Sequence, residues 1–132
     1  MKVVCDTNVL IAGLVADGLC RDIVKRRLPR LELFVSKILL EELENKLHEK
    51  FGIKPDDVPL LGAYRERAHL VKPVPLPKAV CRDSDDDAVL ATAVAAKADL
   101  IITGDKDLPV LKDYEGIRIL SPRQFVELLD SL

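Results

Sequence analysis

The segment CRDSDDDAVLATA, residues 81–93, places four aspartates at or directly ahead of an alanine-rich apolar run. Acidic residues in the first turn of a helix stabilise its N-terminus by roughly 0.3–1 kcal/mol each. Ser84 could cap such a helix, with Asp87 completing the pair three residues later. This explanation accounts for one or two of the acids. It does not require four, so the question is whether other carboxylates point to the same place.

Three further acidic residues lie near positions where strands of a predicted parallel sheet end. Asp6 and Asp105 each come just after an apolar stretch, and Glu42 lies one turn into a helix that follows another such stretch. Aspartate is also a common turn residue, but ligand sites of open α/β sheets form outside the carboxyl ends of the strands. The helix that begins with the aspartate cluster starts at that same edge. Four separate acidic elements are therefore expected to converge there.

A pocket lined only by oxygen ligands favours hard cations such as Mg²⁺ or Mn²⁺, which proteins hold through one or two carboxylates and several waters. Such an ion can polarise a phosphodiester and generate hydroxide from a bound water, and a pair of ions can clamp the attacking and leaving oxygens. The acidic pattern therefore predicts a metal-assisted phosphodiester hydrolase. The two histidines, His48 and His69, lie in charged helical segments without a second ligand at i+4 and are expected to be solvated.

The elements that must position these acids alternate along the chain, and that alternation predicts a three-layer α/β/α sandwich with a central, mainly parallel sheet. Strands are expected at Val3–Cys5, Leu31–Ser36, Asp99–Thr103 and 117–120. Helices are expected at Asn8–Val15, within 18–30 until Pro29 breaks it, at Lys37–Lys50 with Ser36 as cap, at Asp56–Ala68, at Asp85–Lys97, around Leu108–Asp113, and after Ser121. The proline-rich segment 71–81 must be extended and is not expected to form a central strand.

The composition bounds the functions that the chain can have. Its 132 residues suit one domain, and a net charge of −2 offers no global attraction to nucleic acid. Three cysteines without a CxxC spacing argue against a disulfide framework, which favours a reducing cytoplasm. No apolar run has the length of a signal peptide or a membrane span, so no membrane association is expected.

The stretch RDIVKRRLPR is the strongest local concentration of positive charge. Such a stretch is usually the solvated face of a helix. Its functional interpretation is that Arg21, Lys25, Arg26 and Arg27 contact RNA phosphates or the acidic tail of a partner protein. The few aromatic residues are scattered, so a base-stacking platform is not expected.

The sequence resembles the PIN-domain ribonucleases, in particular the VapC-like PIN toxins of prokaryotic toxin–antitoxin pairs. Four segments carry the resemblance: VVCDTNVLIAGL, VSKILLEELENKL, CRDSDDDAVLATAVAAKADLIITGDKDL and GIRILSPRQFVELL. The third segment is highly specific for this family, whereas the tripeptide DTN alone would be weak evidence. The resemblance spans nearly the whole chain and implies a single PIN-like nuclease domain over residues 1–132.

The resemblance also implies a set of site residues and partners. It assigns catalysis and metal binding to Asp6, Glu42, Asp87 and Asp105, adds Asp107 as a fifth metal ligand, and gives Asn8 and Thr103 supporting polar roles. It implies Mg²⁺ or Mn²⁺ as cofactor, RNA as substrate, a small antitoxin protein as partner, and a homodimer in the cytoplasm.

Three other functions stay open at this point. A PIN-fold nuclease could serve RNA processing or decay without an antitoxin, although the short chain favours a toxin. A metal-dependent phosphatase of the haloacid-dehalogenase type needs a second aspartate two positions after the first, where this chain has Asn8. A non-catalytic binding module of the same fold would not need the full acidic set.

Overall fold

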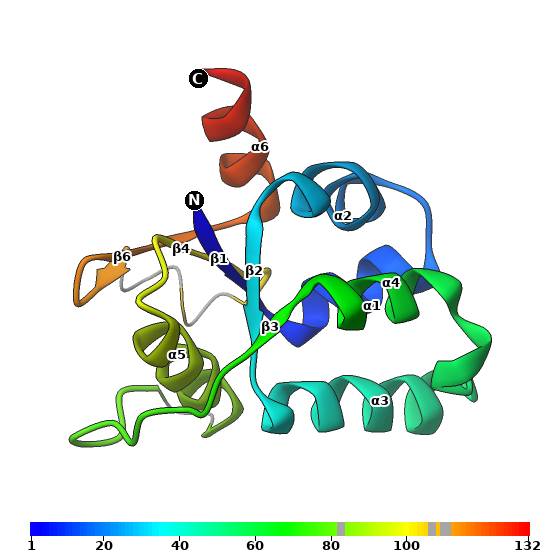
Figure 1. The fold of residues 1–132 in the computed structure, drawn as a ribbon, viewed down its shortest axis with the longest axis horizontal. Helices are drawn as coiled ribbons and strands as arrows, with labels where there is room; N and C mark the ends of the chain where they lie inside the picture. The colour runs from blue at the N-terminus through cyan, green and yellow to red at the C-terminus, as the bar shows by residue number, and fades with distance from the viewer. Residues whose placement is uncertain (82–83, 106–107, 109–111) are drawn as a thin grey trace.

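The computed structural model describes residues 1–81, 84–105, 108 and 112–132. Its centre is a six-stranded sheet in the order β3-β2-β1-β4-β6-β5 (Figure 1). All neighbouring strands are parallel except β5, which is antiparallel to β6. The expected three-layer α/β/α fold with a mainly parallel sheet is therefore confirmed.

The helices and strands have the following bounds: β1 Lys2–Cys5, α1 Thr7–Val15, α2 Leu19–Asp22, η1 Ile23–Arg27, η2 Leu28–Arg30, β2 Glu32–Val35, α3 Lys37–Phe51, η3 Pro55–Asp57, α4 Pro59–Arg67, β3 His69–Leu70, α5 Ser84–Ala96, β4 Leu100–Ile102, β5 Asp113–Tyr114, β6 Ile117–Leu120 and α6 Pro122–Asp130. The four strands expected from the sequence correspond to β1, β2, β4 and β6, and their bounds and those of most helices agree with the expectation to within two residues. None of the helices in the described part of the chain is both long and apolar enough to cross a membrane.

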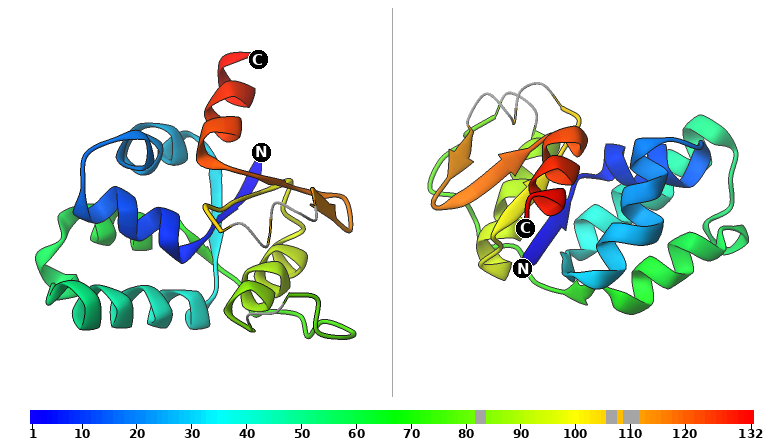
Figure 2. Two further views of the ribbon diagram at one scale, coloured as in Figure 1. Left: turned by 180° about the vertical axis from the view of Figure 1, so that it is seen from behind. Right: turned by 90° about the horizontal axis from the view of Figure 1, so that it is seen from above.

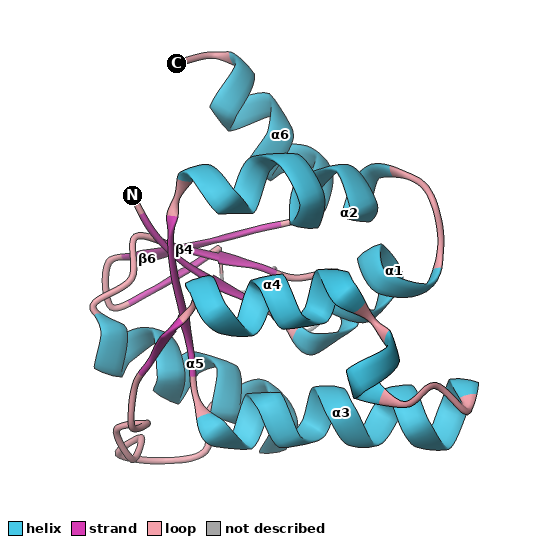
Figure 3. Ribbon diagram, turned by 45° about the vertical axis from the view of Figure 1, so that its right-hand side comes forward, coloured by secondary structure: helices cyan, strands magenta, loops and turns pink. Residues whose placement is uncertain are grey.

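The sheet is the centre of the hydrophobic core, because its middle strands carry apolar residues on both faces. Val3, Val4, Ile101 and Ile102 of β1 and β4 are fully buried, as expected for a parallel sheet covered on both sides. Helices α1 to α4 gather on one side of β1 and β2, and α5 lies on the other side (Figures 1 and 2). The loop after β3 leads past α5 to its N-terminus (Figure 3).

Two buried hydroxyls join the start of α3 to α5. The Thr92 hydroxyl donates to the carbonyl of Ala88 at 2.8 Å, so the Ser36 hydroxyl donates to Thr92 Oγ1, also at 2.8 Å. Ser36 Oγ in turn accepts the Leu39 N–H at 3.4 Å and caps α3, as the sequence predicts. This chain of bonds fixes the α3 N-terminus against α5 at the carboxyl edge of the sheet.

Several local features differ from the sequence expectation. The expected helix 18–30 consists of an α-helical turn, a π-helical turn and a 3₁₀ turn, and Pro29 lies within the last of these, η2, instead of ending the segment. The expected helix Asp56–Ala68 is divided by Val58, which precedes Pro59 and is extended, as a residue before proline prefers.

Two very short strands were not expected. β3 adds only His69–Leu70 to the edge of the sheet beside β2. β5 pairs with β6 through a tight turn in which Glu115 and Gly116 both have positive φ. Because β5 begins at Asp113, the expected helix Leu108–Asp113 is wrong at its end, and its residues 109–111 lie outside the described part of the chain. Asp83 and Asp107 also lie outside it.

Candidate acidic site at the carboxyl edge of the sheet

Asp6 is a buried acid at the carboxyl edge of the sheet. It directly follows β1, it is only 4% exposed, and its N–H donates to the Ile102 carbonyl at the end of β4. Its carbonyl accepts from Val9 and Leu10 and so starts α1. The strand and the helix thus hold the Asp6 backbone from both sides, and the carboxylate position follows from the fold.

A short hydrogen-bond relay connects Asp6 to the end of β4. The Asp105 N–H donates to Thr103 Oγ1 at 3.0 Å, and the Thr103 hydroxyl donates to Asp6 Oδ2 at 2.6 Å. Thr103 is fully buried, and its own N–H donates to the Leu120 carbonyl of β6. The relay orients one oxygen of Asp6 and brings the Asp105 backbone to the same place, so Thr103 connects two of the acids expected at the site.

The environment of Asp6 disfavours its charged form. Burial raises the pKa of the Asp6 carboxyl above its ordinary value of 3.8, and the negative charge of Asp105 adds to the rise. The hydrogen bond from Thr103 and the charge of Lys46 act in the opposite direction without cancelling it. A buried carboxylate beside another carboxylate is stabilised by a bound cation.

Glu42 lies one turn into α3 and has a cation bound to it within the chain. The Lys46 ammonium is 2.8 Å from Glu42 Oε1, and it also donates to Asn8 Oδ1 at 3.5 Å. Burial raises the pKa of Glu42, the contact with Lys46 lowers it, and the charges of Asp85 and Asp6 raise it. The Asn8 side chain therefore contacts Lys46, and its backbone hydrogen-bonds the Asp6 carboxyl and lowers the pKa of Asp6.

The acids at the start of α5 have distinct environments. The Asp87 carboxylate accepts the Val80 N–H at 3.2 Å and the Cys81 N–H at 2.8 Å, and Asp87 lines a pocket together with Ile38 and Pro73. Asp86 is only 4% exposed, and its Oδ2 atom is buried.

Asp85 is exposed, and its charge acts on both Glu42 and Lys46. The sequence assigned the site position to Asp87. The structure instead engages Asp87 with the backbone of the preceding segment and buries its neighbour Asp86.

Asp86 and Lys46 are not among the site residues expected from the sequence. Helical spacing could have indicated Asp86, because it precedes Val89, Leu90 and Ala93 by three, four and seven residues, and all three are buried. Lys46 follows Glu42 by four residues, a spacing at which helical side chains meet.

The oxygen atoms of the site fit a hard cation by their chemistry, although they do not surround a common point in the described structure. Among the described residues, no three His, Cys, Asp or Glu side chains are grouped closely enough to hold a metal ion. Asp6, Thr103 and Asp105 are joined by hydrogen bonds, and Glu42 is within electrostatic range of Asp6. Partly buried carboxylate oxygens are suited to Mg²⁺ or Mn²⁺.

The nearby cysteine is not suited to nucleophilic catalysis. Burial, a hydrogen bond with Asp87 and the charges of Asp87, Asp86 and Asp105 raise the pKa of Cys81 to about 12. A thiol with that pKa is protonated near neutral pH, whereas the thiolate is the reactive form. The chemistry of this site therefore rests on its carboxylates.

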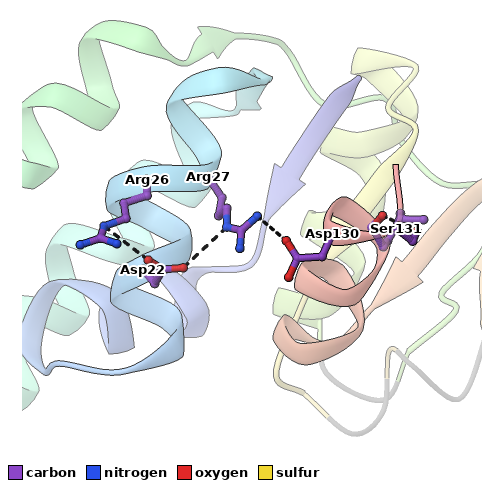
Figure 4. Close-up of polar contacts among 6 residues, drawn as sticks. Asp22, Arg26, Arg27, Asp130 and Ser131 are labelled. Carbon is purple, nitrogen blue, oxygen red and sulfur yellow. Dashed lines mark hydrogen bonds and ion pairs between the residues drawn. The ribbon is translucent and has the colours of Figure 1, made fainter.

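Three of the four basic residues predicted to contact RNA or a partner make contacts within the chain. The Arg21 guanidinium donates to the Gly13 and Leu14 carbonyls at the end of α1. Arg26 and Arg27 share Asp22, and Arg27 also bonds Asp130 of α6 at 2.8 Å (Figure 4). Lys25 is exposed.

Comparisons with known proteins place this geometry in context. A family model described as PIN domain matches residues 2–107, a range that begins with β1 and contains Asp6, Glu42 and Asp105. The chain is also similar to the uncharacterized protein MJ1680 of Methanocaldococcus jannaschii. The two are 30% identical over an alignment of 144 positions, which covers 96% of this chain and 90% of the archaeal protein.

Proposed function

The chain belongs to the PIN-domain family, and from that premise we propose that it is a divalent-metal-dependent endoribonuclease. PIN domains have a nuclease fold and act on RNA. The observation that carries the proposal is the relay from the Asp105 N–H through Thr103 to Asp6, with Glu42 nearby on α3. It orients an acid that the fold has already buried at the carboxyl edge of the sheet.

We propose Asp6, Glu42, Asp86 and Asp105 as the carboxylates of this site. Asp86 replaces Asp87 in this set because it is buried, whereas the Asp87 carboxylate accepts hydrogen bonds from the Val80 and Cys81 N–H groups. Asp107, which the sequence suggested as a fifth ligand, lies outside the described residues and keeps that place as a proposal.

Each carboxylate of the site has its own role in hydrolysis. A bound Mg²⁺ or Mn²⁺ supplies charge neutralisation at the scissile phosphodiester and activation of a water. Asp6, oriented by Thr103, and Glu42, in the first turns of α3, would hold that ion. Asp105, which is half-buried, adds negative charge on the β4 side. These carboxylates define where an RNA backbone must approach for cleavage.

A cleavage assay with chelation and metal return tests this proposal. Purified protein is incubated with single-stranded RNA after dialysis against EDTA, and then with Mg²⁺ or Mn²⁺ restored. We expect no cleavage in EDTA and recovery with either metal, and the Asp6→Asn variant should stay inactive throughout. Cleavage by metal-free protein at the full rate would contradict the proposal.

We further propose that this nuclease is the toxin of a toxin–antitoxin pair, inhibited by a small antitoxin protein. The support is the sequence resemblance, which extends through four segments of the chain. Induced expression of the parent should arrest bacterial growth, whereas the Asp6→Asn variant should not. Normal growth with an active, soluble parent would instead favour a role in RNA processing or decay.

A further inference from the structure

Lys46 is the cation at the centre of the acidic site. Its ammonium lies 2.8 Å from Glu42 Oε1 and 3.5 Å from Asn8 Oδ1, and its side chain is only 24% exposed. The charges of Asp85 and Asp6 also act on it. The acids that face it therefore come from three parts of the fold: the end of β1, the first turns of α3 and the start of α5.

An ordinary surface ion pair does not explain this arrangement. The pair Lys37–Glu41 has the same four-residue spacing on the same helix, but its atoms are 3.9 Å apart and its side chains are 84% and 59% exposed. Such exposed helical pairs contribute little. Glu42 is 16% exposed, so the contact with Lys46 lies where solvent screens charge less.

The contact has a consequence for metal binding. A divalent ion that binds Glu42 through Oε1 must replace the ammonium there, and an ion that binds through Oε2 is repelled by the ammonium 2.8 Å from Oε1. Metal binding therefore competes with an interaction that the folded chain already makes.

We propose that Lys46 is a resident counter-ion of the acidic site, which a divalent ion must displace from Glu42 and which thereby sets the metal affinity. This inference rests on the proposed metal-dependent function. Lys46 is a positioning residue, because it acts through Glu42. In the metal-free protein it balances the carboxylates, and after displacement its chain tethers the ammonium beside Asn8.

Isothermal titration calorimetry with Mn²⁺ tests the inference on the full chain and three variants. Lys46→Gln removes the charge, Lys46→Arg keeps it, and Lys37→Gln removes the same charge from the exposed pair on the same helix. We expect Lys46→Gln to bind Mn²⁺ about threefold to tenfold more tightly than the parent, since a nearby positive charge and a competitor are both lost. Lys46→Arg and Lys37→Gln should stay within about twofold of the parent.

Thermal melts of the same proteins give a second measurement. In EDTA, Lys46→Gln should melt below the parent and below Lys37→Gln, because the carboxylates lose their counter-ion. Saturating Mn²⁺ should raise the melting temperature of Lys46→Gln more than that of the parent. A ligand that binds only the native state stabilises it more when its affinity is higher. A melting point in EDTA equal to that of Lys37→Gln would contradict the counter-ion role.

The outcomes separate this inference from the proposed function. Equal or weaker Mn²⁺ binding by Lys46→Gln, with clear binding by the parent, would overturn the role of Lys46 and leave the metal-dependent nuclease standing. A parent that binds no Mn²⁺ at all would contradict the nuclease proposal itself. Tighter binding by Lys46→Gln together with unchanged binding by Lys46→Arg would support both.

Discussion

At the scale of single residues, the site consists of carboxylates whose burial opposes their ionisation. Burial raises the pKa of both Asp6 and Glu42, and the charges of neighbouring acids contribute to each rise. A carboxyl whose folded-state pKa is raised favours the folded state when it is protonated. Its contribution to stability is present below the unfolded pKa and is lost as the pH rises through the folded pKa. Without metal, these acids therefore destabilise the fold near neutral pH.

Asp6→Asn should for this reason melt at a higher temperature than the parent in EDTA at pH 7, by roughly 2–5 °C. The difference in melting temperature should shrink as the pH is lowered toward 3.8, the ordinary pKa of the carboxyl. At that pH the Asp6 carboxyl of the parent becomes protonated and is then neutral, like the amide of the variant. Saturating Mn²⁺ should stabilise the parent more than the variant. Differential scanning calorimetry at several pH values measures all three effects, and a lower melting point for Asp6→Asn in EDTA would refute the explanation.

Asp86 and Asp87 should respond differently to the same substitution. Asp86→Asn removes a buried charge of the proposed site, so we expect Mn²⁺ affinity to fall more than about tenfold and cleavage to fall by orders of magnitude. Asp87→Asn weakens the bonds to the Val80 and Cys81 N–H groups and should mainly lower stability, by about 1–2 kcal/mol. Calorimetry and urea unfolding of both variants decide the matter, and a larger loss of Mn²⁺ affinity in Asp87→Asn would return the site position to Asp87.

This pair also marks a limit of sequence reasoning. The sequence places an acid of the cluster at the site, but neighbouring helical residues point about 100° apart, so an error of one position changes which side chain is assigned to the site. The apolar residues three, four and seven positions after Asp86 favour it, and the packing of α5 shows that Asp86 is buried. Asp6, in contrast, follows from the end of an apolar strand, a position that does not depend on helical rotation.

At the scale of elements, the Ser36 and Thr92 hydroxyls fix α3, and with it Glu42, to α5. Ser36→Ala removes both the cap of α3 and a buried hydrogen bond, so it should cost about 1–3 kcal/mol of unfolding free energy. Ser121→Ala is the matched control. It removes the capping box of α6 at a more exposed position and should cost about 1 kcal/mol. Urea unfolding measures the free energy of unfolding of both variants. An equal loss in the two would mean that the buried hydrogen bond between Ser36 and Thr92 does not contribute to stability.

In the basic segment, Arg27 is held by contacts within the chain, whereas Lys25 is exposed. Arg27 joins η1 to α6 through Asp22 and Asp130 (Figure 4), so Arg27→Gln should lower the melting temperature and leave the salt dependence of RNA binding unchanged. Lys25→Gln should weaken RNA binding slightly and reduce its salt slope by about one, as the loss of a phosphate contact does. Binding titrations at several salt concentrations would exclude this division if both variants lowered the slope equally.

The sequence predicted the long elements because each has its own periodicity and termini. Ser36 and Ser121 marked helix starts, and apolar stretches marked β1, β2, β4 and β6. Sequence patterns could not predict β3 or β5, since two residues pair only where a neighbouring strand presents its edge. The π-helical turn of η1 likewise reflects packing of the buried Ile23 and Val24, which local propensity does not specify.

At the scale of the whole molecule, the fold brings segments that are far apart in sequence to one edge of the sheet. Asp6 and Thr103 are separated by 97 residues and joined by one hydrogen bond. Parallel strands and the helices that follow them make this convergence general, and the sequence could therefore predict it. The position of Lys46 between three acids depends on side-chain packing and emerges only from the structure.

The measurement that tests the central claim most directly is the single-turnover rate of RNA cleavage by the parent, Glu42→Gln and Glu41→Gln at saturating Mn²⁺. Glu41 and Glu42 are sequence neighbours on α3, but Glu41 is 59% exposed and pairs with Lys37, whereas Glu42 is 16% exposed and within electrostatic range of Asp6. We predict that Glu42→Gln is slower than the parent by about 100-fold or more, and that Glu41→Gln stays within about twofold. Equal rates for Glu42→Gln and the parent would contradict the assignment of this carboxyl edge as the site of hydrolysis.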